Sequence, residues 1–290
     1  MQRGFFTPAS SSPPLQPPPL PAQPQLARSL ADSSRVRPPP VASLFPPSLR
    51  SFRYSSSPDG TDANLLILFH GRGDTAEAYV RFAEKLNLPQ TAVLALDGTL
   101  PVLFLDRGRS WFTAFESDGE LIEAVVGEKR RRASLAATVD AVCQVVAALV
   151  SLGWTHRCFH LFGFSDGGTV ALEVALRHTG SVALGSCVSV CGGLLPETLD
   201  ASRACAAPPH TPILITSGET DALMPALLLE RTRELLLQAA PGCASVESIA
   251  GKGHAMVSSP KEARILMQFW SHALRHTPVT ADGETLHEVV

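Results

Sequence analysis

The 290-residue sequence has no apolar run that approaches the roughly 20 residues needed to span a bilayer. No compact apolar segment follows its first positive charge, Arg3. These two absences argue against an integral membrane segment and against a secretory signal. Charged residues make up only 18% of the chain and hydrophobic residues 45%, which is typical of a protein with a substantial buried core.

Cysteine is present, but its spacing fits neither a disulfide framework nor a zinc site. Two of the six cysteines, Cys187 and Cys191, lie in an apolar run, where core packing is the simplest explanation. We therefore expect free thiols, no bound metal and a reducing compartment such as the cytoplasm.

Positive charge is scarce outside the first 53 residues. That first segment holds six arginines and a single acid, Asp32, whereas the rest of the chain holds 18 basic and 26 acidic side chains. An acidic body disfavours nucleic acid or an anionic membrane as the main partner.

The first 53 residues also differ from the rest in proline content. Thirteen of the 24 prolines fall within the first 47 positions. Because proline interrupts helices and sheets, we expect residues 1–53 to be disordered, with a folded domain over 54–276 and a polar tail at 277–290. An arginine-rich, acid-poor segment also suits an organelle transit peptide, and its prolines suit weak docking to partner domains. Both interpretations stay open.

Short apolar runs alternate with amphipathic stretches through the expected domain. The clearest helix is expected over 128–152, where apolar residues recur at spacings of four, three, four and three: Leu135, Val139, Val142, Val146 and Leu149. Strands are expected at 64–69, 91–96, 159–162, 182–190, 212–217 and 245–249, further helices at 75–86, 169–177, 226–239 and 260–274, and a long loop at 101–115. This alternation predicts a mostly parallel sheet with helices on both faces and no separate lid domain.

The stretch from Gly163 to Gly167 reads G-F-S-D-G, which matches the pattern G-x-S-x-G. An apolar strand precedes it and a helix follows, as in a nucleophile elbow, a strained turn that exposes a serine. The nucleophile would be Ser165. Glycines are needed because side chains two residues from it would collide with the turn. The alternative is a serine that merely caps the helix.

A serine nucleophile needs a histidine base, and the base needs a carboxylate to orient it. In the chain order serine, acid, histidine, Asp221 follows the expected strand at 212–217, and His254 precedes the last helix. Asp200 lies in a proline- and alanine-rich loop with no strand immediately before it, and it is the alternative acid. Without catalysis, Asp221 would be a turn or capping residue and His254 a surface histidine.

Acyl transfer also requires two donors that point at the developing oxyanion. We expect the backbone N–H groups of Asp166, directly after the serine, and of Arg72, in H-G-R-G-D after the first core strand, to supply them. Gly71 and Gly73 would let that backbone approach a substrate closely. The same loop also suits a strand-to-helix turn in which Asp74 caps the helix, and both interpretations can hold together.

Taken together, four motifs resemble the phospholipase/carboxylesterase family of α/β-hydrolases, which includes acyl-protein thioesterases and lysophospholipases. They are H-G-R-G-D at 70–74, G-F-S-D-G-G at 163–168, G-E-T-D at 218–221 and G-H at 253–254. The resemblance covers roughly residues 60–275 and implies an α/β-hydrolase fold in one lidless domain, no cofactor, and Ser165, Asp221 and His254 as the catalytic triad. The thioesterases usually have Gln where this chain has Asp166.

The activity implied is hydrolysis of small-molecule or lipid acyl esters or thioesters through an acyl-Ser165 intermediate. A ligand-binding or sensor protein that keeps the hydrolase fold but turns over negligibly is the alternative.

Overall fold

The computed structural model describes residues 37–103, 105–177, 183–199, 211–239 and 242–277. All of them belong to one compact unit, which spans Ser33–Val290. The expected disorder of residues 1–36, the alternative acid Asp200 and most of the expected tail lie outside the described residues.

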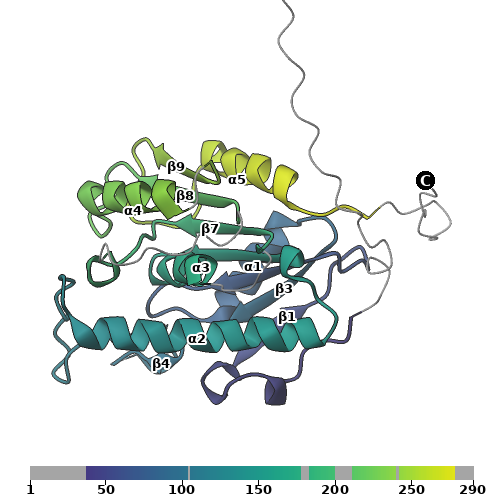
Figure 1. Ribbon diagram of the computed structural model, residues 1–290, viewed down its shortest axis with the longest axis horizontal. Helices are drawn as coiled ribbons and strands as arrows, with labels where there is room; N and C mark the ends of the chain where they lie inside the picture. The colour runs from purple at the N-terminus through teal and green to yellow at the C-terminus, as the bar shows by residue number, and fades with distance from the viewer. Residues whose placement is uncertain (1–36, 104, 178–182, 200–210, 240–241, 278–290) are drawn as a thin grey trace, which may run out of the picture. The chain divides into compact units, whose positions relative to one another are not determined.

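A seven-stranded sheet forms the centre of the domain, with β1 at one edge and β9 at the other (Figure 1). The strand order is β1-β3-β2-β6-β7-β8-β9, and all neighbouring pairs are parallel except β1 with β3. The strands are β1 (Phe52–Ser55), β2 (Asn64–Phe69), β3 (Thr91–Leu96), β6 (Phe159–Phe164), β7 (Ser186–Val190), β8 (Ile213–Gly218) and β9 (Ala244–Ile249). The prediction of a mostly parallel sheet is confirmed.

Helices cover both faces of this sheet. Helices α2 (Lys129–Ser151), α3 (Asp166–Arg177) and α4 (Ala226–Ala239) pack on one face, and α1 (Ala76–Leu86) and α5 (Pro260–Ala273) on the other. In β2, Leu65 and Ile67 join the first of these cores, whereas Leu66 and Leu68 join the second. A strand with apolar neighbours on both faces has no polar alternation, which explains the unbroken apolar run in the sequence.

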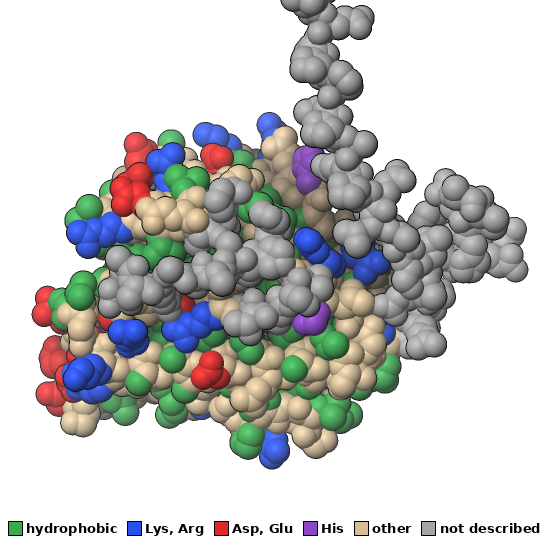
Figure 2. All heavy atoms as spheres, in the orientation of Figure 1, with side chains coloured by type: hydrophobic (Ala, Val, Ile, Leu, Met, Phe, Trp, Pro, Cys, Tyr) green, Lys and Arg blue, Asp and Glu red, His purple; other side chains and the backbone are tan. Residues whose placement is uncertain are grey.

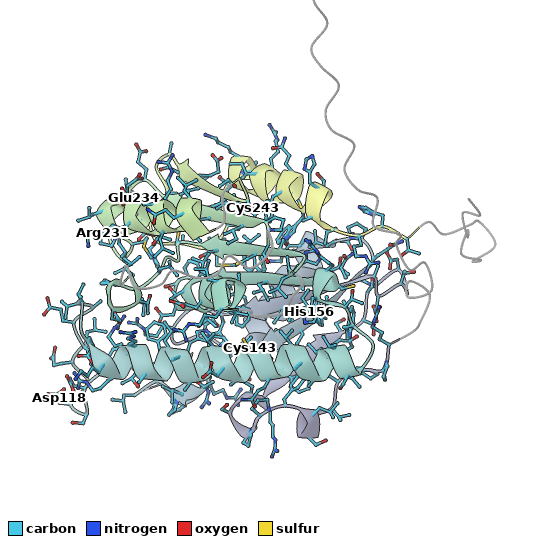
Figure 3. All side chains as sticks on the ribbon, viewed as in Figure 1. Asp118, Cys143, His156, Arg231, Glu234 and Cys243 are labelled. Carbon is cyan, nitrogen blue, oxygen red and sulfur yellow. The ribbon has the colours of Figure 1, made fainter. Side chains whose placement is uncertain are left out.

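Helix α2 bears out the predicted helix at 128–152. The five residues predicted to share a face are fully buried: Leu135, Val139, Val142, Val146 and Leu149. By length and composition alone α2 would also suit a membrane span. Its buried apolar side chains belong to the same core cluster as side chains of β2, β3 and α3, as in the core helix of a globular domain. Charged side chains gather where α2 begins (Figure 2), near Asp118, and His156 lies near its other end (Figure 3).

The folded part begins before residue 54, so the predicted boundary at 53 was wrong. Residues 42–44 and 47–49 form short 3-10 turns, and the side chains of Phe45 and Leu49 are buried in the core. Arg37 lies 4.5 Å over the ring of Trp154 and donates to the carbonyl of Gly153. Proline keeps this segment from forming a long helix, but it does not prevent the apolar side chains between prolines from packing.

Two smaller elements also differ from expectation. The loop predicted at 101–115 contains a two-stranded antiparallel ladder, β4 (Leu100–Pro101) with β5 (Arg109–Ser110). The edge strand β1 has only half-buried residues on its inner side, so it lacks the apolar run that marks the central strands.

Candidate active site

Ser165 lies in the sharp turn between β6 and α3, at the carboxyl edge of the sheet. Its φ is +53°, in the left-handed region that non-glycine residues rarely adopt. A Cβ on Gly163 would lie 2.1 Å from the carbonyl oxygen of Gly167, and one on Gly167 would lie 2.3 Å from that of Phe69. Both positions therefore require glycine, as the motif predicts.

The structure brings Ser165, His254 and Asp221 together from three different loops. His254 Nε2 lies 2.8 Å from Ser165 Oγ, and His254 Nδ1 lies 3.0 and 2.9 Å from the two carboxylate oxygens of Asp221. With the proton on Nδ1, the imidazole donates to Asp221 and can accept the serine proton on Nε2. The three side chains form a Ser–His–Asp relay of the predicted order.

Asp221 is held in place by backbone donors as well as by His254. Its Oδ1 accepts hydrogen bonds from the N–H groups of Leu223 and Met224, both at 2.9 Å. Burial opposes ionisation of this carboxyl, but the hydrogen bonds from Met224, His254 and Leu223 outweigh it and hold the pKa of Asp221 below its usual value. Asp221 is thus kept as a carboxylate.

The loops that carry Asp221 and His254 are braced against each other. The carbonyl of Lys252 accepts hydrogen bonds from the backbone N–H and the hydroxyl of Thr220, both at 2.9 Å. A Cβ on Gly218 would lie 2.2 Å from the same carbonyl, so only glycine fits there. The Lys252 ammonium is buried in an ion pair with Glu262 of α5, which also accepts from Thr216. Nothing in the local sequence pairs Lys252 with Glu262.

The loop after β2 presents one free donor. The N–H of Gly71 donates to the hydroxyl of Tyr79, and the N–H of Gly73 donates to the carbonyl of Arg109. Both N–H groups therefore already have an acceptor within the protein and are not available to a substrate. Among the described residues the Arg72 N–H has no acceptor. The Asp166 N–H is the first of α3, and such an N–H has no acceptor within its helix.

Other contacts that the sequence does not reveal fix this loop from behind. The Trp111 indole donates to the carbonyl of His70 at 2.7 Å, and Gly98 N–H donates to the His70 ring at 2.9 Å. Burial lowers the pKa of His70 and keeps the ring neutral. The alternative interpretation, in which Asp74 caps the helix, is not what the structure shows: Asp74 accepts from the N–H of Thr75, and the first N–H of α1, on Ala76, donates to Asp97.

Cys191 is an unexpected neighbour of the relay. It follows β7 with a φ of +51°, and its Sγ lies 3.4 Å from the carbonyl of Ala255. Its sulfur and the donor atoms of Asp221 and His254 lie within 4.8 Å of one another, a set of atoms that could hold a metal ion. Burial raises the pKa of the Cys191 thiol, which disfavours the thiolate that metals bind. A metal here would also displace the hydrogen bond between His254 and Asp221.

Comparisons with known proteins bear on this arrangement. A model of the phospholipase/carboxylesterase family matches residues 55–272. An uncharacterised hydrolase of Mycosarcoma maydis is 33% identical over 185 residues, which cover 62% of this chain and 65% of the relative. The chain therefore spans less than two thirds of that relative's length.

Solved structures share the fold. The crystal structure of esterase PE8 gives a TM-score of 0.62 at 19% identity, covering 78% of this chain and 99% of that one. Acyl-protein thioesterase 2 of Zea mays gives 0.57 at 18% identity, with coverage of 78% and 99%. The fold is the α/β-hydrolase fold, without a separate lid domain among the described residues.

Proposed function

The chain belongs to the phospholipase/carboxylesterase family of hydrolases, and we propose that it hydrolyses carboxylic esters or thioesters through an acyl-Ser165 intermediate. The observation that carries the proposal is the hydrogen-bonded relay from Ser165 Oγ through His254 to Asp221, with distances of 2.8 to 3.0 Å. A serine at a strained turn, a base and a buried carboxylate in this geometry are what acyl transfer requires.

In the proposed first step, Ser165 Oγ attacks the acyl carbon while His254 Nε2 takes the serine proton. The carbonyl oxygen becomes an oxyanion that the N–H groups of Arg72 and Asp166 stabilise. When the tetrahedral intermediate collapses, His254 gives its proton to the leaving alcohol or thiol. Asp221 keeps the proton on Nδ1 throughout, so that Nε2 faces the serine.

In the second step, water replaces the leaving group. The water oxygen attacks the acyl carbon while His254 takes a proton from the water. His254 then returns a proton to Ser165 Oγ as the carboxylic acid leaves. No cofactor is needed for either step, since the bonds that form and break involve only the substrate, the serine and water.

Turnover of a soluble activated ester tests this proposal. We expect the wild-type chain to hydrolyse a nitrophenyl acyl ester and to be labelled by a fluorophosphonate probe, and Ser165→Ala to lose both while remaining folded. Ser271→Ala, at an exposed serine on α5, is the matched control and should behave like the wild type. Labelling that persists in Ser165→Ala would place the nucleophile elsewhere.

Negligible wild-type turnover would favour the alternative of a ligand-binding or sensor protein. If the wild type does turn over the nitrophenyl ester, a panel of acyl esters and thioesters of graded chain length identifies the acyl group and the leaving atom that the enzyme prefers.

A further inference from the structure

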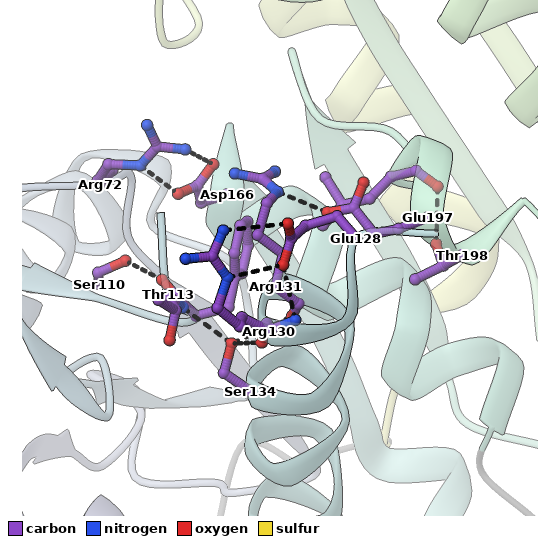
Figure 4. Close-up of polar contacts among 12 residues, drawn as sticks. Arg72, Ser110, Thr113, Glu128, Arg130, Arg131, Ser134, Asp166, Glu197 and Thr198 are labelled. Carbon is purple, nitrogen blue, oxygen red and sulfur yellow. Dashed lines mark hydrogen bonds and ion pairs between the residues drawn. The ribbon is translucent and has the colours of Figure 1, made fainter. Parts of the chain in front are cut away.

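The side chains of Arg72 and Asp166 form a two-point ion pair (Figure 4), and Asp166 directly follows Ser165 in the chain. Arg72 Nε lies 2.7 Å from Asp166 Oδ2, and Arg72 Nη2 lies 3.0 Å from Asp166 Oδ1. The Asp166 side chain is 11% exposed and that of Arg72 28%, so solvent screens the pair only in part. The guanidinium also lies 5.6 Å from the ring centroid of Phe115.

The pair follows from the register of two neighbouring strands. Phe69 of β2 lies opposite Gly163 of β6 in a parallel ladder. Arg72 and Asp166 each come three residues after one member of this register pair. The two loops that leave the same sheet edge therefore carry the two partners. These residues are also the ones whose backbone N–H groups we assign to the oxyanion.

This arrangement contains an electrostatic conflict. Asp166 donates its backbone N–H to a position where negative charge develops, yet its own side chain is negative. The carboxylate and the N–H belong to the same residue, so the oxyanion would form near a like charge in a partly buried site, where the two repel each other strongly. The conflict disappears when a cation is held against the carboxylate, and Arg72 is placed to do this with two hydrogen bonds.

We propose that Arg72 is a positioning residue whose guanidinium neutralises the Asp166 carboxylate, so that the two N–H donors can stabilise an oxyanion. The inference rests on the proposed acyl-Ser165 mechanism. The substrate carbonyl carries no full charge, whereas the tetrahedral intermediate does. Loss of the neutralising cation should therefore lower kcat and leave KM nearly unchanged.

Charge neutralisation and a simple tether between loops have different consequences. Arg72→Met and Asp166→Asn both break the same ion pair, so a tether predicts equal losses. Neutralisation predicts unequal losses, because Arg72→Met leaves a bare carboxylate beside the oxyanion and Asp166→Asn does not. In the double variant neither charge remains, so activity should recover relative to Arg72→Met.

Steady-state kinetics on a nitrophenyl ester test the proposal with the full chain. We expect Arg72→Met to lower kcat about 100-fold. Asp166→Asn and the double variant should each stay within about tenfold of the wild type, because no bare carboxylate remains. Arg72→Lys keeps the cation and should retain most of the activity. Arg53→Met is the control, since Arg53 forms an exposed ion pair with Glu77 at 3.2 Å, and it should leave kcat unchanged.

Equal losses in the two single variants, no recovery in the double variant, or a change confined to KM would overturn the proposal. Thermal unfolding of every variant shows whether it folds; if Arg72→Met does not, Arg72→Lys and the double variant carry the test. Full activity in Ser165→Ala would instead refute the proposed function. If Ser165→Ala is inactive and Arg72→Met is fully active, only the role of Arg72 fails.

Discussion

The carboxylate of Asp221 accepts hydrogen bonds from two backbone N–H groups and contacts the imidazole of His254. These contacts suggest a test of whether Asp221 is the acid that orients His254. The N–H groups of Leu223 and Met224 both point at Oδ1. In Asp221→Asn these donors would hold the amide oxygen at the same position, which turns the NH2 group toward His254. His254 would then have to accept at Nδ1, so its proton would lie on Nε2, where it could no longer take the proton of Ser165.

We therefore expect Asp221→Asn to lower kcat by a factor of about 10³–10⁴. Asp200→Asn tests the alternative acid and should change kcat by less than about tenfold, as for a surface site. Measuring kcat for both folded variants decides between them. The reverse ranking would remove Asp221 from the relay and leave Ser165 and His254 in place.

The buried ring of His160 leads to a prediction about how the free energy of unfolding depends on pH. It is buried in the central strand β6, where its ring contacts Ser186 and Asn64 at 2.8 and 3.2 Å. Burial, together with the charge of Arg275, lowers the pKa of His160 to about 3. The folded protein therefore keeps this ring neutral at pH values where an unfolded chain, with a histidine pKa near 6.5, takes up a proton.

Because the unfolded state binds the extra proton, the stabilisation from His160 is complete above pH of about 6.5 and is lost as the pH falls from there toward 3. Urea unfolding across this range should show a smaller pH dependence in His160→Gln than in the wild type. His272→Gln, at an exposed histidine on α5, should keep the wild-type slope. Identical slopes in all three proteins would mean that His160 is not the group responsible.

At the scale of whole elements, the ion pair between Lys252 and Glu262 joins the loop of His254 to helix α5. Both side chains are almost completely buried, with exposed fractions of 3% and 0%. Removing one partner of such a pair leaves an uncompensated buried charge, which costs about 3–5 kcal/mol. Since Lys252 precedes His254 by two residues, the loss should also disturb the relay.

We expect Lys252→Met to lower the free energy of unfolding by about 3–5 kcal/mol and to lower kcat as well. Lys261→Met, one residue before Glu262 and exposed, is the control and should change neither. Adding Glu262→Leu to Lys252→Met should restore part of the stability, because no buried charge then remains. An unfolding free energy unchanged by Lys252→Met would show that the pair adds no stability.

For the molecule as a whole, the position where the folded part begins determines which truncations it tolerates. Phe45 and Leu49 are buried in the main core, 2% and 0% exposed, although they lie in the proline-rich segment. A chain that starts at Arg37 keeps both side chains, and a chain that starts at Ser51 loses them. Burial of one such side chain contributes about 1.5–3 kcal/mol.

We therefore expect removal of residues 1–36 to leave the unfolding temperature and ester turnover unchanged. Removal of residues 1–50 should lower the unfolding temperature by several degrees. In a domain of this size, a loss of a few kcal/mol in the free energy of unfolding lowers the unfolding temperature by about that amount. Differential scanning calorimetry of the two truncated chains measures the difference. Equal unfolding temperatures would mean that residues 37–50 add no stability and that the folded domain starts after residue 53, as the sequence predicts.

The sequence by itself determined the alternation of strands and helices, and the turn around Ser165. Both are local properties, since a strand buried on both faces needs an apolar run and the elbow needs glycine at Gly163 and Gly167. The chain order also placed Asp221 and His254 after the right strands. For this reason the fold class and the three side chains of the relay can be predicted from the sequence alone.

Only the tertiary structure decided which distant side chains meet. The ion pair of Arg72 with Asp166 joins residues 94 positions apart, and that of Lys252 with Glu262 joins residues 10 positions apart. Neither pair has a signature in its local sequence. Such contacts depend on the order and register of the strands, which bring loop residues to the same sheet edge. The burial of Phe45 depends in the same way on a core that other parts of the chain provide.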